Sequence, residues 1–232
     1  MMRVAGKITP MVMRLRIVLL GVKPAPWRRI EVLASTTLAG LHEVIQAAMG
    51  WEDLHLHCFR ILGRRYDGEY ADLTRVLLAD LRLRAGERFT YTYNHFAGWE
   101  HELRVEAVGP GQPRRRYPRC VGGQHPCPPE WCPSPDAMDE IKGDLLGLSY
   151  AEDLDLMVAF GRAVLDARDG TVREALDAVG EDELRLALAR QKRREVLLAV
   201  FERRHANKVL TQLRKPTTEA SHADPVYPDL DH

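Results

Sequence analysis

The first third of the chain alternates between apolar and polar positions in a way that predicts two strands. Leu15, Ile17 and Leu19 lie on one side of an extended segment, with Arg16 between them. The segment Lys23-Pro24-Ala25-Pro26 interrupts the pattern, because its two prolines donate no ladder hydrogen bonds. Alternation resumes over residues 27–32. The pattern therefore predicts a β-hairpin with a long loop.

A helical period follows the hairpin. Residues 35–37 read Ser-Thr-Thr and offer an N-cap, and Gly50 stands where a C-terminal glycine is expected. Between them the apolar residues recur at helical spacing: Leu38, Leu41, Ile45, Ala48 and Met49. This pattern predicts an amphipathic helix whose apolar stripe lies across the sheet.

Three more strands are predicted beyond the helix, at residues 55–62, 89–93 and 99–108. In the last of these, Trp99, His101 and Leu103 share one face, and Glu100 and Glu102 point to the other. One helix on a sheet is the simplest packing for this order of elements. We expect an α+β domain over residues 14–148, with a β-grasp-like mixed sheet, one packed helix and a cysteine-rich loop.

The C-terminal part has a different pattern. Residues 150–214 are expected to be helical, ending in a long, highly charged helix from Glu181 to about Leu213. Its thin apolar line suits a dimerisation or partner-binding arm, although packing on the main domain is the simpler alternative. Residues 215–232 show no pattern and are expected to be a disordered tail.

Composition narrows the range of functions. The chain has 232 residues with 33 basic and 33 acidic side chains, so no overall charge draws it to nucleic acid or to an acidic membrane. Basic runs such as residues 114–116 and 190–194 are first interpreted as solvated surface. No secretion signal or membrane-length apolar segment is found, so we expect a cytoplasmic protein whose four cysteines are thiols or metal ligands.

The loop after residue 109 holds the first candidate site. Cys120, Cys127 and Cys132 lie within thirteen residues among glycines and prolines. Thiolates favour zinc, and an irregular loop with little core of its own needs a cross-link. We predict a structural zinc site with His101 as the fourth ligand, and with His125 and His57 as alternatives. Three ordinary reduced thiols are an equally good interpretation.

The segment His55-Leu56-His57 holds the second candidate group. The two histidines lie on the same face of a predicted strand and could be metal ligands or bases in a cleft. A hydrogen-bonded structural histidine is the more common case at such positions.

Several segments together resemble one protein family. The segments are GVKPAPWRRIEV, TTLAGLHEVIQAAMGWEDLHLHCF, LRAGERFTYTYN, WEHELRVE and RYPRCVGGQHPCPPEWC. In this order they resemble the plasmid pRiA4b Orf-3-like family over about Met13 to Cys132. The resemblance implies a bacterial protein associated with plasmids or transposons, and it supplies no settled biochemical activity.

Family positions carried over onto this chain include His42, Trp51, His55, His57 and His101, together with the three loop cysteines. One departure concerns the turn before the Trp-Glu-His motif. Family members have an acidic turn resembling Y-D-F-G-D, whereas this chain reads Tyr-Asn-His-Phe-Ala-Gly at residues 93–98. Any role of those carboxylates is therefore lost here.

The functional hypothesis from sequence is a non-catalytic binding or accessory protein that holds a protein or nucleic acid. No nucleophile elbow, phosphate-binding glycine loop or H-E-x-x-H pair is found. The alternative is a metal-dependent hydrolase or nuclease with histidine and cysteine ligands and with Glu100 or Glu102 as base. Strand parity argues against the alternative, because both glutamates point away from His101.

Overall fold

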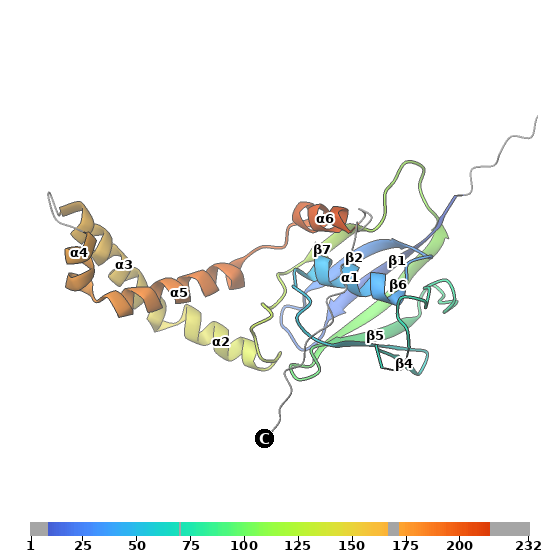
Figure 1. The fold of residues 1–232 in the computed structure, drawn as a ribbon, viewed down its shortest axis with the longest axis horizontal. Coiled ribbons are helices and arrows are strands. Elements are labelled where there is room, and N and C mark those ends of the chain that lie inside the picture. The colour runs from blue at the N-terminus through green and yellow to red at the C-terminus, as the bar shows by residue number, and fades with distance from the viewer. Residues whose placement is uncertain (1–8, 70, 167–171, 214–232) are drawn as a thin grey trace, which may run out of the picture.

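A seven-stranded sheet forms the main body of the protein (Figure 1). The computed structural model describes residues 9–69, 71–166 and 172–213. The strands are β1 (Met11–Leu19), β2 (Trp27–Leu33), β3 (His57–Ile61), β4 (Arg64–Tyr66), β5 (Arg88–Tyr93), β6 (Trp99–Pro110) and β7 (Arg119–Gln124). They lie in the order β4-β3-β5-β6-β1-β2-β7.

The predicted α+β class is confirmed, but the strand pairing differs from that of a β-grasp sheet. Every strand pairing is antiparallel, where the expected mixed sheet would contain a parallel pair. The turn at residues 94–98 makes β5 and β6 a hairpin, and β6 is also antiparallel to its other neighbour, β1. Strand β7, inside the segment expected to be a loop, adds the edge beside β2.

Helix α1 (Leu38–Met49) covers the inner face of the sheet. The side chain of Thr37 accepts a hydrogen bond from the Gly40 amide at 3.0 Å, and Gly50 ends the helix with a φ of 88°. The predicted helix and both of its caps are confirmed. Its buried side chains meet the alternate inward residues of β1, β5 and β6, and this contact forms the core.

Four helices form an arm that projects from the sheet (Figure 1). They are α2 (Ala137–Leu146), α3 (Leu148–Asp166), α4 (Val172–Val179) and α5 (Glu181–Leu198). Asp153 of α3, 2% exposed, pairs with the buried Arg194 of α5 at 2.6 Å and with Arg190. In the described residues no helix is both long and apolar enough to cross a membrane.

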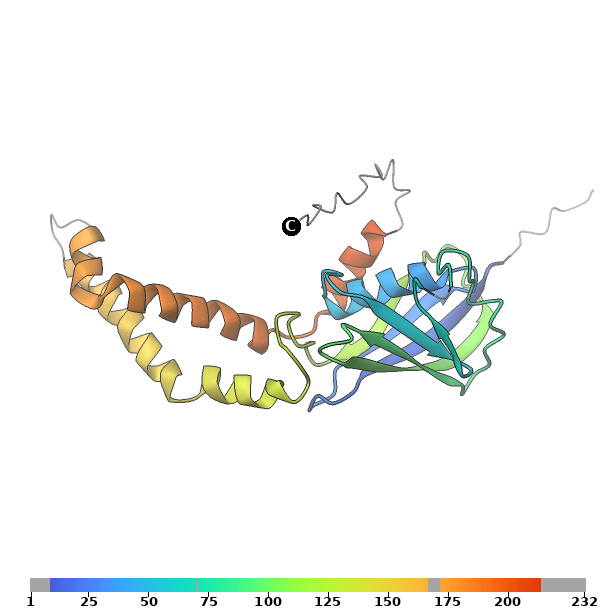
Figure 2. The same cartoon turned by 60° about the horizontal axis from the view of Figure 1, so that its bottom comes forward.

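The long charged helix predicted for residues 181–213 is wrong as one element. It breaks at residues 199–202, and α6 (Arg203–Gln212) returns to pack on α1 and β7 (Figure 2). Asn207 fixes this return, because its side chain bonds both the amide and the carbonyl of Cys120, at 2.9 and 2.8 Å. The tail at 215–232 lies outside the described residues.

Candidate metal centre

The three loop thiols each have a different set of neighbours. The Cys120 thiol donates to the Gly122 carbonyl at 3.2 Å. Cys127 Sγ lies 3.3 Å from the sulfur of Met49, and Cys132 Sγ lies 3.8 Å from that of Met138. No group of metal-ligand atoms in the described chain includes any of these sulfurs. The four-ligand zinc site with His101 therefore stays a prediction, and this arrangement of side chains does not favour it.

The environment of Cys127 also disfavours the thiolate that zinc requires. Burial raises the pKa of this thiol to about 11, although the Arg28 guanidinium opposes the shift. The Arg28 guanidinium is itself buried and donates to Cys127 Sγ at 3.2 Å and to the carbonyls of Ala48 and His125. Burial likewise raises the thiol pKa of Cys120 and of Cys132.

His101 is fully buried beside Trp51, whose ring meets it edge-on with centroids 5.3 Å apart. Its Nδ1 lies within hydrogen-bond distance of the carbonyls of Tyr91 and Trp99, at 3.2 and 3.1 Å. The Nε2 atom is buried and has no partner among the described residues. The inward orientation predicted from strand parity is confirmed by this burial.

A second group of side chains has the geometry of a metal site. His42, Asp53 and His57 each offer one ligand atom, and these atoms all lie within 4.8 Å of one another. His42 Nε2 is 2.8 Å from Asp53 Oδ1. The two imidazole rings are stacked, with centroids 3.5 Å apart and an angle of 4° between their planes.

Three segments bring these side chains together. His42 extends from the buried stripe of α1, and His57 begins β3. Asp53 lies in the connection between them, where its φ of 61° is a left-handed conformation that aspartate tolerates better than most residues. Its side chain is 52% exposed, so solvent reaches the group from this side.

Hydrogen bonds behind the group fix the ring of His42. Its Nδ1 lies 2.8 Å from the hydroxyl of Tyr91, which also accepts a hydrogen bond from Gln46 Nε2 at 2.8 Å. Such outer contacts set the tautomer and orientation of a metal-binding imidazole. Next to them, the Tyr93 hydroxyl donates to Glu130 and accepts from the amide of Leu54 at 2.8 Å.

Both imidazoles are kept neutral. Burial lowers the pKa of His57 to about 4, and the neighbouring His42 contributes to this shift. Burial also lowers the pKa of His42, against the opposing effect of Asp53. A neutral imidazole has the free lone pair that a metal requires, so protons compete weakly for this site near neutral pH.

Sequence reasoning found only part of this group. It considered His57 as a ligand, named His42 only among the family positions, and missed Asp53. A signal for His42 was present, because a polar residue four positions after Leu38 and three before Ile45 interrupts an apolar stripe. No comparable signal points to Asp53.

Comparison with known proteins identifies the family to which the α+β domain belongs. The plasmid pRiA4b ORF-3-like protein family matches residues 11–145. The chain belongs to the plasmid pRiA4b ORF-3-like family. The matched region holds the whole sheet, α1 and all three members of the group, so the group is part of the family domain.

Two relatives extend the comparison beyond the family domain. The "Uncharacterized protein y4hQ" of Sinorhizobium fredii (strain NBRC 101917 / NGR234) is 30% identical over 192 residues, which cover 79% of this chain and 97% of that protein. The crystal structure of MM3350, a protein of unknown function from Methanosarcina mazei Go1, is 28% identical. Its TM-score is 0.56, and the match covers 65% of this chain and 90% of that one.

Proposed function

We propose that this protein is a non-catalytic metal-binding accessory protein that holds one divalent transition-metal ion at His42, Asp53 and His57. The observation that carries the proposal is the convergence of three ligand atoms within 4.8 Å from three separate segments. Two neutral imidazoles and a carboxylate suit zinc and its neighbours in the transition series, whereas magnesium and calcium prefer sites made of oxygen alone.

Metal binding at His42 requires a defined proton arrangement. Without a metal, the Nε2–H of His42 donates to Asp53, and Nδ1 accepts from the hydroxyl of Tyr91. If a metal were held on Nε2, Nδ1 would carry the proton and would donate it to the phenol oxygen. Tyr91 serves in both states because a hydroxyl is donor and acceptor.

Metal-dependent hydrolysis is the second candidate function. It is favoured by the number of protein donors, since three ligands leave a position for water, and by the exposed Asp53 on the solvent side. The general base suggested from sequence does not support it. Glu100 and Glu102 extend from the face of β6 opposite to the buried His101.

The proposal is tested by zinc titration of the purified, metal-free protein with calorimetry, and by the visible spectrum of the cobalt(II) form. We expect one equivalent to bind, and His57→Gln and Asp53→Asn to weaken binding at least tenfold. Matched controls are His55→Gln, an exposed histidine two residues away, and Asp72→Asn, an exposed carboxylate on another loop.

A variant with serine at positions 120, 127 and 132 separates the two metal sites. Retention of one zinc in this variant supports the histidine–aspartate site. Loss of zinc there, with full binding in His57→Gln, would instead establish the cysteine site. Zinc-dependent cleavage of a phosphodiester that is lost in Asp53→Asn would favour the hydrolase over the accessory role.

A further inference from the structure

The outer face of the sheet carries no helix in the described part of the chain. Figure 2 shows α1 and α6 on one side of the strands and an open face on the other. The outward side chains of β1, β2, β3, β5, β6 and β7 include seven arginines and four glutamates. They are Arg14, Arg16, Arg29, Arg60, Arg88, Arg104 and Arg119, with Glu31, Glu100, Glu102 and Glu106.

Four of these arginines form one continuous row across four adjacent strands. Arg16 of β1 lies opposite Arg29 of β2 on one side and opposite Arg104 of β6 on the other. Arg104 in turn lies opposite Arg88 of β5. We call these four residues the arginine row. Neighbouring strands are about 4.8 Å apart, so the row extends over roughly 14 Å.

Such a row costs stability, because like charges directly opposite each other on a sheet repel. The two ends of the row are compensated: Arg29 pairs with Glu106 at 2.6 Å, and Arg88 pairs with Glu102 at 2.9 Å. The two central arginines, Arg16 and Arg104, are exposed and have no carboxylate partner among the described residues. The centre of the row is therefore available to an anion from outside.

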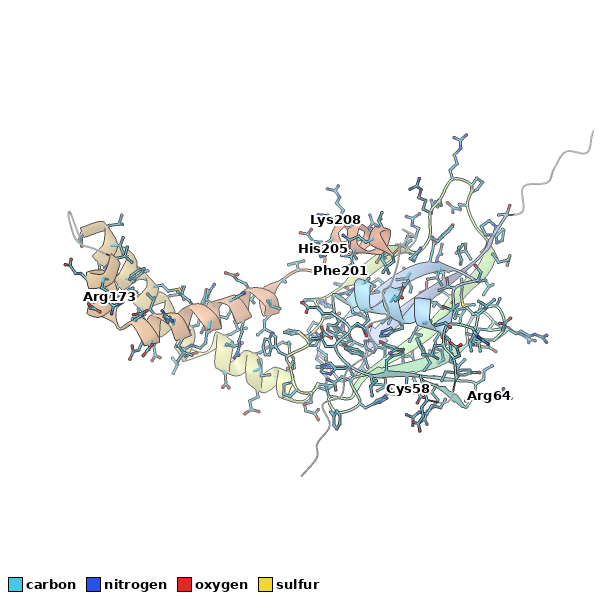
Figure 3. All side chains as sticks on the ribbon, in the orientation of Figure 1. Cys58, Arg64, Arg173, Phe201, His205 and Lys208 are labelled. Atoms are coloured by element: carbon cyan, nitrogen blue, oxygen red, sulfur yellow. The ribbon has the colours of Figure 1, made fainter. Side chains whose placement is uncertain are left out.

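Two further features near the arginine row favour the binding of a polyanion. Trp27 lies beside it, with the guanidinium groups of Arg16 and Arg29 at 5.0 and 5.5 Å from its ring centre. Towards β4, a hollow of about 390 Å³ opens on the same face. It is lined by Cys58, Arg60, Arg65, Thr90, Thr92, His95 and Glu100. Cys58 marks this region in Figure 3.

We infer that the outer face of the sheet binds the phosphate backbone of duplex DNA through the arginine row. Guanidinium groups bind phosphate with paired, charge-assisted hydrogen bonds. The phosphates of one DNA strand rise by about 3.4 Å each along the helix axis, so a row of roughly 14 Å is long enough to contact more than one successive phosphate. These contacts are made to the phosphate backbone, so we expect no preference for a particular base sequence.

The zero net charge of the chain conceals the local excess of positive charge on this face. The proposed DNA contacts involve residues of the outer face, whereas the proposed metal group lies against α1 on the inner face. A failure of DNA binding would therefore leave the proposed metal site untouched, and a failure of metal binding would leave the DNA-binding face untouched.

The test is fluorescence anisotropy of a labelled 20-base-pair duplex at several NaCl concentrations between 50 and 200 mM. The variant is Arg16→Gln with Arg104→Gln in the full chain. The control is Arg75→Gln with Arg173→Gln, which removes the same charge from two exposed surface sites, 85% and 74% exposed. Figure 3 shows Arg173 on the distant arm.

For the wild type we expect log K to fall steeply with log salt. The row variant should bind at least tenfold more weakly at 50 mM NaCl, with a slope less negative by about 2, since each phosphate contact contributes roughly 0.9. Arg16→Lys with Arg104→Lys keeps both charges and should retain most of the slope. Zinc binding should be unchanged in all of these proteins.

Three outcomes would overturn the inference. One is a wild type that does not bind the duplex. Another is an equal loss of affinity in the row variant and in the control. The third is salt-sensitive binding of the wild type to vesicles with 30% phosphatidylserine but not to the duplex, which would identify an anionic membrane surface as the partner. Circular dichroism of each variant checks that a loss of binding is not a loss of fold.

Discussion

The guanidinium of Arg28 lies 3.8 Å from the centre of the Phe201 ring. This contact connects the C-terminal helices to the sheet. Phe201 follows the end of α5 and is labelled in Figure 3. Its ring also lies against the backbone of Gly123, where any added Cβ would collide with it. The buried Arg28 has no carboxylate partner among the described residues, so the ring and several carbonyls surround its charge.

Replacing Phe201 with alanine should weaken the attachment of the segment between α5 and α6 to the sheet. We expect the free energy of unfolding to fall by about 2 kcal/mol, because the variant loses a cation–π contact and part of a buried ring. Urea unfolding followed by tryptophan fluorescence measures the change. Val200→Ala, at an 81% exposed neighbouring position, is the control and should have little effect. Equal stability of the two variants would show that the contact contributes nothing.

The arm depends on one buried charge. Asp153 is held between Arg190 and Arg194, whose side chains are 31% and 1% exposed. Asp153→Ala leaves the buried Arg194 without its counter-charge, so we expect a loss on the order of 3 kcal/mol in the stability of the arm. Circular dichroism at 222 nm during urea unfolding reports on these helices. Asp155→Ala, at an exposed position of the same helix, should leave the transition in place.

Features set by residues close together in the sequence could be predicted, whereas features that depend on contacts between distant segments could not. Period-two alternation correctly placed Trp99 and His101 inside and Glu100 and Glu102 outside, because strand parity is a local property. The caps of α1 were equally local. The arginine row was invisible, since it exists only through the register that puts Arg16 opposite Arg29 and Arg104.

The candidate sites illustrate the same limit. Cys120, Cys127 and Cys132 are close along the chain, but Cys120 joins a strand beside β2, and Cys127 packs towards the end of α1. Asp53 reaches His42 because a left-handed residue redirects the chain after α1, and nothing in the local pattern marks that geometry. Spacing along the chain therefore does not show which of these side chains meet in space.

Acidification should destabilise the α+β domain through its neutral histidines. Burial lowers the pKa of His57 and of His101 to about 4 in the native protein, whereas an exposed histidine titrates near 6.5. Between pH 6.5 and about 4, the unfolded chain takes up protons that the native protein does not bind. The free energy of unfolding should therefore fall across this window, by up to about 1.4 kcal/mol per pH unit for each such histidine.

Urea unfolding at pH 7.5, 6 and 5 measures this dependence. His57→Gln removes one of the titrating groups, so its profile should be shallower than that of the wild type. His55→Gln, an exposed neighbour, is the matched control and should keep the wild-type slope. A wild-type profile that stays flat from pH 7.5 to pH 5 would show that these imidazoles are not held neutral.

Cys127 should react slowly with alkylating reagents in the native protein. Only the thiolate attacks an alkylating reagent, and burial raises the pKa of this thiol to about 11. At pH 8 the thiolate fraction is then roughly two hundred times smaller than for an ordinary cysteine of pKa 8.5. Iodoacetamide labelling at pH 8, followed by mass spectrometry of the peptide, should show slow modification of Cys127 in the folded chain and rapid modification in urea.

Phe201→Ala opens the cavity of about 190 Å³ that Arg28, Cys127 and Phe201 line, so it should speed the labelling. Rapid labelling in the folded wild type would mean that Cys127 exists as a thiolate, and it would return the cysteine loop to consideration as a metal site.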